Sequence, residues 1–262
     1  MIGFLIKKFF FDLWDNLFKI ALINIGFVAS LSFPVFVPGL VESVPLLAAG
    51  TVLIGMLWCC VYLSAAALSL KNLSDYGNFG FADFLNNLKA AWPFGLVSGG
   101  FVFLGYLLCT VVIPFYLSMK SMAGLLLAAV IFWTLVVAFL ALQFFFAVRA
   151  RLDTKIIKVI KKCFIIFFDN PWFCVFSLVH NAAVLLISVF LAFLFPGPAG
   201  LLLFLDEGLR LRLFKYDWLE ANAGTGNGQG KKREIPWDAL LIDEREKTGT
   251  RSFKSFIFPW KD

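Results

Sequence analysis

Two acidic residues and an arginine interrupt the last apolar stretch of the chain. Asp206, Glu207 and Arg210 follow directly on the apolar run 199–205. Ionisable side chains at membrane depth are costly and commonly mark the path of an ion or a substrate. Asp206 and Arg210 also have the i,i+4 spacing of an ion pair on one helix. The alternative is a cluster at the membrane boundary, where Arg210 reaches the headgroups.

A second polar position lies in the preceding apolar run, 172–195. His180 is the only histidine of the chain, and Asn181 follows it. The pair could relay protons or bind a polar substrate, although one histidine cannot form a metal site. The alternative is hydrogen bonding between packed helices. The candidate intramembrane polar site therefore comprises His180, Asn181, Asp206, Glu207 and Arg210.

Other chemistry is not indicated by the sequence. It contains no nucleophile–base pair, clustered metal ligands, phosphate loop or acidic dyad. The five cysteines form no CxxC pair, which is typical of small hydrophobic residues in a packed interior. The net charge of +6 is spread along the chain instead of forming a basic stripe for nucleic acid. We therefore expect no enzyme activity, no cofactor, no metal and no nucleic-acid partner.

The elements that must position these residues are membrane-spanning helices. The chain is 61% hydrophobic and 15% charged, and its apolar residues form long runs. A helix needs roughly 20 apolar residues to cross the hydrocarbon core of a bilayer. The sequence predicts an all-α, polytopic transmembrane bundle with about six spans, of which the charged sixth has the weakest pattern: 17–40, 44–70, 94–119, 122–148, 172–195 and 198–216.

The basic residues predict the orientation of these spans. Lys7 and Lys8 precede the first span, and Lys161 and Lys162 precede the fifth. The connections on the opposite side contain little charge. Because basic loops stay in the cytoplasm, both termini are expected there.

The segments before the first, third and fifth spans resemble one another. Residues 4–16 (FLIKKFFFDLWDN) and 158–170 (KVIKKCFIIFFDN) share six positions in register, and the segment 81–94 (FADFLNNLKAAWPF) is a weaker copy. Each segment has the amphipathic pattern of a helix that lies on the membrane surface. Each is expected to turn into a hairpin at Asn16, Pro93 or Pro171, which gives three units of one interfacial helix and two spans.

Gly95 and Gly99 form a GxxxG motif at the start of the third span. Two glycines at this spacing allow another helix to approach closely. The partner is either a helix of the same chain or a second protomer. Internal packing is favoured, because a six-span bundle must first pack itself.

The chain divides into a transmembrane domain (1–220), a flexible linker (221–230) and a cytoplasmic tail (231–262). The linker reads ANAGTGNGQG, a composition typical of a flexible connection. The tail ends in an aromatic group formed by Phe253, Phe256, Phe258 and Trp260. This group is a candidate for binding a partner protein or an anionic headgroup layer, and the alternative is a solvated tail.

These segments together resemble the YesL-like integral membrane proteins of bacteria. The resemblance covers roughly residues 4–215 and depends on FFFDLWDNLFKIALINIGF, FADFLNNLKAAWPF, KIIKVIKKCFIIFFDNP and GPAGLLLFL. It implies a multi-pass protein of the bacterial inner membrane with no assigned biochemistry, often encoded beside carbohydrate ABC transporters. It carries over no catalytic residue, and the long tail after residue 220 departs from the family pattern.

Two functions remain open at this point. The first is a non-enzymatic accessory or assembly partner of a membrane complex, with an ABC-type transporter as one candidate, that acts through its cytoplasmic face and tail. The second is a small-solute or ion transporter whose polar path lies near the fifth and sixth spans.

Overall fold

The computed structural model describes residues 1–222, 235–249 and 251. These residues form helices joined by short connections, and no strand occurs among them. Most of the predicted linker lies outside the described residues, as do the tail residues Phe253, Phe256, Phe258 and Trp260.

Five helical segments are long and apolar enough to cross a membrane, which confirms the prediction of a multi-pass helical membrane protein. Two of them are interrupted helices: the third contains a π-helical turn, and the fourth ends in a short helix that carries Arg149 and Arg151. The segments are α2 (Leu17–Leu40), α3 (Pro45–Ser74), α4 with η1 and α5 (Phe81–Leu107, Leu108–Val112 and Ile113–Ser118), α6 with α7 (Met122–Leu142 and Phe145–Arg151), and α9 (Pro171–Phe190).

The predicted sixth span, 198–216, is a helix but is not one of these five. It belongs to α10 (Gly197–Ala221). Asp206, Glu207, Arg210 and Arg212 end its apolar run after about two turns. That stretch is too short to cross the hydrocarbon core by itself.

Two of the three predicted surface helices occur as separate elements. They are α1 (Ile2–Asp15) and α8 (Ile156–Asp169). The third prediction is wrong, because α4 runs through Pro93 without the expected turn. A proline removes only one hydrogen bond of a helix, and a packed neighbouring helix can compensate for it. Pro93 leaves the Lys89 carbonyl without its helical donor. The helix α4 continues because α3 packs along it, with Ser64 of α3 donating to the nearby Ala91 carbonyl at 3.1 Å.

Gly95 and Gly99 lie at the contact between α4 and α3. A Cβ atom on Gly95 would come within 2.3 Å of Val61 Cα, and one on Gly99 within 2.6 Å of Leu57 Cδ2. At Gly95 the neighbouring atom belongs to the backbone, so only glycine permits this approach, whereas at Gly99 the Leu57 side chain would have to move. The motif is therefore used to pack two helices of the same chain.

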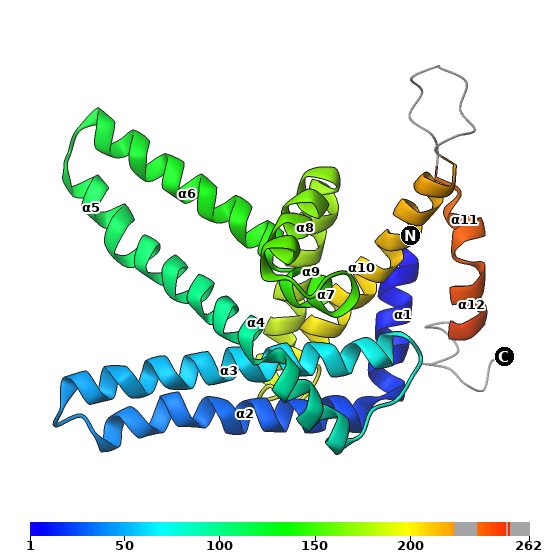
Figure 1. Cartoon of the computed structure of the whole chain (residues 1–262), viewed down its shortest axis with the longest axis horizontal. Coiled ribbons are helices and arrows are strands. Elements are labelled where there is room, and N and C mark those ends of the chain that lie inside the picture. The colour runs from blue at the N-terminus through cyan, green and yellow to red at the C-terminus, as the bar shows by residue number, and fades with distance from the viewer. Residues whose placement is uncertain (223–234, 250, 252–262) are drawn as a thin grey trace.

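The centre of the fold is α10, which packs against α1, α2, α3, α7 and α9 (Figure 1). Its Leu203, Phe204, Leu209 and Leu211 are fully buried. The hairpin of α5 and α6 instead projects away from this centre, and α2 and α3 form a second projection beside each other (Figure 1). Two short helices, α11 (Trp237–Leu240) and α12 (Ile242–Thr248), lie next to α1.

The buried amide of Asn24 on α2 makes three hydrogen bonds at the start of α10. Its Nδ2 donates to the carbonyls of Leu194 and Pro196, at 3.1 and 2.7 Å, and its Oδ1 accepts from the backbone N–H of Ala199 at 2.9 Å. Gly197 lies directly on this amide with φ of 60°, so that a Cβ there would meet Asn24 Nδ2 at 2.3 Å. The turn between α9 and α10 therefore depends on α2.

We predict that Asn24→Leu lowers the free energy of unfolding. Each backbone group that loses its partner inside the protein costs about 1–3 kcal/mol. Equilibrium unfolding in mixed detergent micelles measures the change. Asn86→Leu is the matched control, because Asn86 is exposed on α4. Equal stability of the two variants would contradict the assigned role of Asn24.

Candidate functional site

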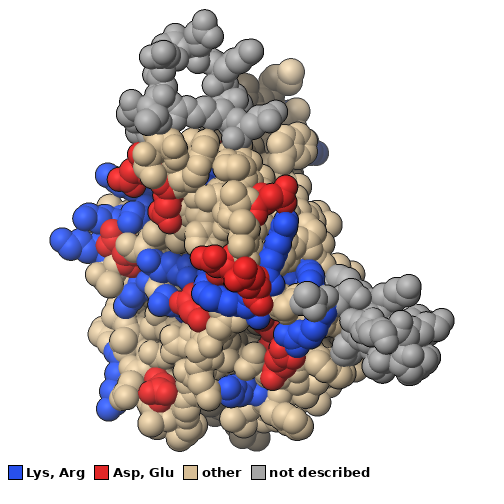
Figure 2. All heavy atoms as spheres, turned by 90° about the vertical axis from the view of Figure 1, so that its right-hand side faces the viewer, with Lys and Arg blue, Asp and Glu red and all other residues tan. Residues whose placement is uncertain are grey.

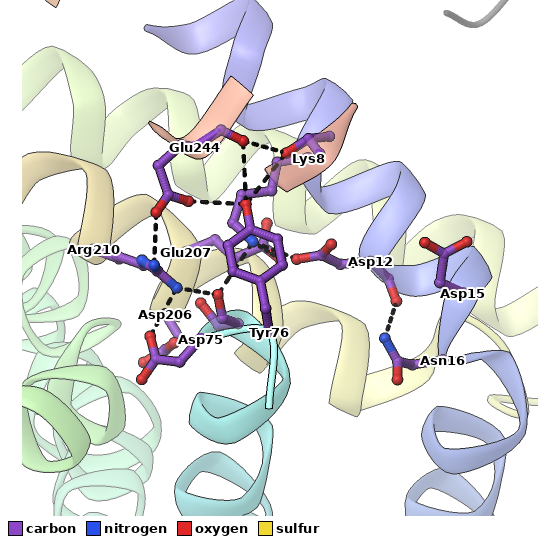
Figure 3. Close-up of polar contacts among 12 residues, drawn as sticks. Lys8, Asp12, Asp15, Asn16, Asp75, Tyr76, Asp206, Glu207, Arg210 and Glu244 are labelled. Carbon is purple, nitrogen blue, oxygen red and sulfur yellow. Dashed lines mark hydrogen bonds and ion pairs between the residues drawn. The ribbon is translucent and has the colours of Figure 1, made fainter. Parts of the chain in front are cut away.

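Lys, Arg, Asp and Glu side chains gather on one face of the molecule (Figure 2), and further charged side chains from five elements meet beneath the surface. We call this group the charged cluster (Figure 3). It joins α1, the end of α3, α7, α10 and α12, and it comprises Lys8, Asp12, Asp75, Arg151, Asp206, Glu207, Arg210 and Glu244.

Lys8 is the cation at the centre of one half of the cluster. Its Nζ lies 2.5 Å from Asp12, 3.2 Å from the carbonyl of Ser74 and 4.0 Å from Glu207. The side chain is 0% exposed, so Lys8 lies in the interior of the protein although α1 has the pattern of an interfacial helix. The reason is that α1 packs its lysine side against α10, where a buried carboxylate needs a cation.

Glu207 is the most isolated carboxylate of this half. Its side chain is 0% exposed, and neither of its oxygens has a hydrogen-bond partner among the described residues. Burial raises the pKa of the Glu207 carboxyl well above its ordinary value, and Lys8 is the nearby positive charge that opposes this rise. Burial lowers the pKa of the Lys8 ammonium, but Glu207, Asp12 and Tyr76 outweigh burial, and the net pKa is raised. Lys8 is held in its charged form.

Asp206 belongs to the other half of the cluster and is paired with Arg151. Arg151 Nε donates a hydrogen bond to Asp206 Oδ1 at 2.9 Å, and Arg151 Nη2 donates one to Asp206 Oδ2 at 2.5 Å. The pair is therefore bidentate. The expected i,i+4 pair of Asp206 with Arg210 is therefore not formed. Arg210 turns instead to Asp75 at 2.8 Å and to Glu244 at 2.6 Å.

Asp75 connects the two arginines at the end of α3. It accepts from Arg151 at 2.9 Å and from Arg210 at 2.8 Å. Burial raises the pKa of its carboxyl, but Arg151, Arg210 and Lys71 outweigh burial and hold the pKa below its ordinary value. The charged form of Asp75 is thus stabilised by cations from three elements.

His180 and Asn181 do not join the cluster. The imidazole stacks on Phe204, with ring centroids 3.7 Å apart, and its edge contacts Phe9 at 5.2 Å. His180 Nδ1 and Asn181 Oδ1 are buried without a hydrogen-bond partner among the described residues. The site predicted from sequence therefore divides into a charged part and an aromatic part.

The remaining predicted lysines lie near the surface. Lys7 donates to the carbonyl of Gly249 at 3.2 Å, Lys161 is exposed, and Lys162 pairs with Asp153 at 3.4 Å. On α8, Val159, Cys163 and Ile166 are buried, in keeping with an amphipathic helix.

Four residues of the cluster were missed as site residues by sequence reasoning: Asp12, Asp75, Arg151 and Glu244. The sequence offered one indication of their role, which is that Asp75 and Arg151 stand at the ends of two apolar segments. No local spacing links Asp75, Arg151 and Glu244 to their ion-pair partners in the cluster, which lie 34 to 135 positions away. Within the described residues, no three His, Cys, Asp or Glu side chains are placed to hold a metal ion. Ion pairing is the chemistry that this arrangement supports.

We predict that Lys8→Met destabilises the fold strongly. The substitution leaves Asp12 and Glu207 without their shared cation, and removing one partner of a buried ion pair typically costs about 3–5 kcal/mol. Equilibrium unfolding in mixed micelles measures the change, with Lys161→Met as the control at an exposed lysine. If both variants unfold like the unaltered protein, Lys8 does not neutralise these carboxylates.

Comparison with known proteins identifies no relative of this chain. No protein-family model matches the chain, and no curated protein or solved structure shows significant similarity to it. The resemblance to the YesL-like proteins therefore stays a prediction.

Proposed function

We propose that this chain is a non-enzymatic membrane protein, an accessory or assembly partner of a membrane complex, and that it binds a transmembrane helix of its partner on α6. The observation that carries this proposal is the uncovered state of the α5–α6 hairpin. Between Met122 and Thr134, only Gly124 and Ala128 of α6 are buried. Helices of a self-contained bundle normally cover a wider stripe of each neighbour.

A groove of 520 Å³ runs along this uncovered helix and ends at Phe164 of α8. Its lining residues recur every three or four positions and thus share one face of α6: Leu126, Ala129, Val130, Trp133, Thr134, Val137 and Ala138.

The chemistry of the groove fits a helix better than a polar solute. Its lining contains no charged residue, and the Thr134 hydroxyl already donates to the Val130 carbonyl of its own helix at 2.8 Å. Ala129 and Ala138 are small enough for the backbone of another helix to approach. An apolar transmembrane segment with small residues at the contact is the occupant that this surface suits.

The transport alternative is supported less well. Asp206 is bonded to Arg151, and Glu207 faces Lys8, so both carboxylates have compensating charges inside the protein. Asn24 holds the α9–α10 turn only seven residues after α2 begins, about 10 Å along the helix axis. This shallow turn supports a position of the charged cluster close to one membrane boundary instead of the bilayer centre.

The orientation proposed with this function places both termini and the charged cluster in the cytoplasm. The distribution of Lys and Arg supports it. The resemblance described above adds the bacterial inner membrane as the location and an ABC-type transporter as one candidate complex.

Photo-crosslinking in cells tests the proposed function. A photoreactive amino acid in place of Trp133 is expected to crosslink one membrane protein reproducibly, whereas the same replacement of Phe36, an exposed residue of α2, is not. Ala129→Phe fills the groove and should reduce the Trp133 crosslink several-fold, because the partner helix can no longer approach.

Ala123→Phe is the matched control for the groove, since Ala123 is also exposed on α6 but does not line the groove. The control should leave the crosslink intact. Equal crosslinking at Trp133 and Phe36, or an equal effect of the two alanine variants, would contradict a partner site on α6.

A further inference from the structure

Two carboxyl groups in one half of the charged cluster share a single ammonium group. Asp12 of α1 and Glu207 of α10 both contact Lys8 (Figure 3), whose Nζ lies 2.5 Å from Asp12 Oδ2 and 4.0 Å from Glu207 Oε1. The side chains of Lys8 and Glu207 are 0% exposed, and that of Asp12 is 10% exposed. Water therefore hardly solvates any negative charge that Lys8 leaves uncompensated.

The other half of the cluster is balanced in charge. It consists of three carboxylates and three cations, and each carboxylate contacts at least one of the cations. The residues are Asp75, Asp206 and Glu244 with Lys71, Arg151 and Arg210. The excess of acidic groups over cations in the cluster and its contacts therefore lies at Asp12 and Glu207.

The remaining titratable groups around Glu207 do not replace the missing cation. Tyr76 donates its hydroxyl to the carboxylate on α12 at 2.9 Å. His180 of α9 stacks on Phe204, one turn before Glu207 on α10. Lys247 of α12 is exposed and lies 5.6 Å from the centroid of the Tyr76 ring, without an ion pair to either carboxyl group. Glu207 thus has only the ammonium group that it shares.

The oxygens of Glu207 also lack a hydrogen-bond donor among the described residues. An ionised carboxylate accepts hydrogen bonds and donates none. The carboxyl group within hydrogen-bonding reach of Glu207 is that of Asp12. Two ionised carboxylates repel each other at this distance, whereas a protonated carboxyl group can donate to an ionised one. Such a pair carries one negative charge, which a single ammonium group matches.

We infer that Glu207 binds a proton in the folded protein and donates it to Asp12, so that the two groups form an acid pair with one net charge. The ligand of this interior site is a proton, and Lys8 is the counter-ion. Because Asp12 and Lys8 belong to α1 and Glu207 belongs to α10, the proton helps to hold these two helices together. This inference is independent of the partner proposed for α6.

The pKa of the Glu207 carboxyl agrees with this assignment. Burial raises it, the charge of Lys8 lowers it, and Asp12 and Asp206 raise it further, so that it lies well above the ordinary value of 4.5. The unfolded chain loses this proton near the ordinary value, whereas the folded chain keeps it. Unfolding therefore releases a proton between the two values, and the stability of the folded state falls as the pH rises through that window.

The substitution Glu207→Gln tests the inference in the full-length protein. The amide of Gln has the shape of a protonated carboxyl group but does not titrate. Equilibrium unfolding in mixed micelles is measured at a series of pH values. Above pH 4.5 and up to the raised pKa, we expect the unfolding equilibrium constant of the unaltered protein, relative to that of this variant, to rise about tenfold per pH unit.

Glu244→Gln is the matched control, because Glu244 is also buried, at 3% exposed, but is bonded to Arg210. Relative to this variant, the unfolding equilibrium constant of the unaltered protein should stay constant over the same pH range. A constant ratio for Glu207→Gln as well would overturn the inference, because Glu207 would then be ionised beside Lys8.

Infrared spectroscopy detects the proton in the folded protein. A protonated carboxyl group has a C=O stretching band that an ionised carboxylate lacks, and the band shifts on exchange into D₂O. In a detergent without ester groups at neutral pH, we expect this band in the unaltered protein and in Glu244→Gln, and its loss in Glu207→Gln.

Asp12→Asn is a second variant that does not alter Glu207 itself. It leaves Glu207 as the only acidic group beside Lys8, so the proton is no longer needed and the band should disappear. A band that persists in Asp12→Asn or in Glu207→Gln would contradict a proton shared by these two residues.

Discussion

Asp206 and Glu207 stand next to each other on the most central helix of the protein, with 2% and 0% of their surfaces exposed. A buried carboxylate is tolerated only when a cation or several donors compensate for it. Successive residues of a helix point about 100° apart, so one cation cannot serve both. Arg151 reaches Asp206 from α7, and Lys8 reaches Glu207 from α1. The need to compensate these two buried acidic groups favours the observed positions of α1 and α7.

The remaining contacts follow from that placement. Once Arg151 is bound to Asp206, Asp75 and Ser74 at the end of α3 can bond to the same guanidinium. Arg210 is then free to hold α12 through Glu244. At the other end of α10, Asn24 of α2 holds the first turn. Polar contacts thus join elements that are far apart in the sequence. The α5–α6 hairpin takes part in none of the contacts named here, and it projects from the rest of the protein.

Local patterns predicted much of the fold. The apolar run 17–40 coincides with α2, and the paired segments 4–16 and 158–170 correspond to α1 and α8. Hydropathy predicts which segments are withdrawn from water, but it does not predict which helix each segment packs against. Pro93 was misread because its helix is supported by α3 from outside. The burial of Lys8 could not be predicted from α1 alone, because its partner Glu207 is 199 positions away in the sequence. Asp206 and Glu207 were recognised as unusual, but their cations could not be assigned from spacing.

A double-mutant cycle on Arg151 and Asp206 tests the central claim most directly. Equilibrium unfolding in mixed micelles would compare Arg151→Met, Asp206→Asn and the double variant, with the exposed pair of Arg245 and Asp238 as the reference cycle. The account predicts that each single substitution is strongly destabilising, on the order of 3–5 kcal/mol for Arg151→Met, and that the double variant loses much less than the sum. The reference cycle should show almost no coupling. Additive losses at Arg151 and Asp206 would mean that this pair does not organise the fold.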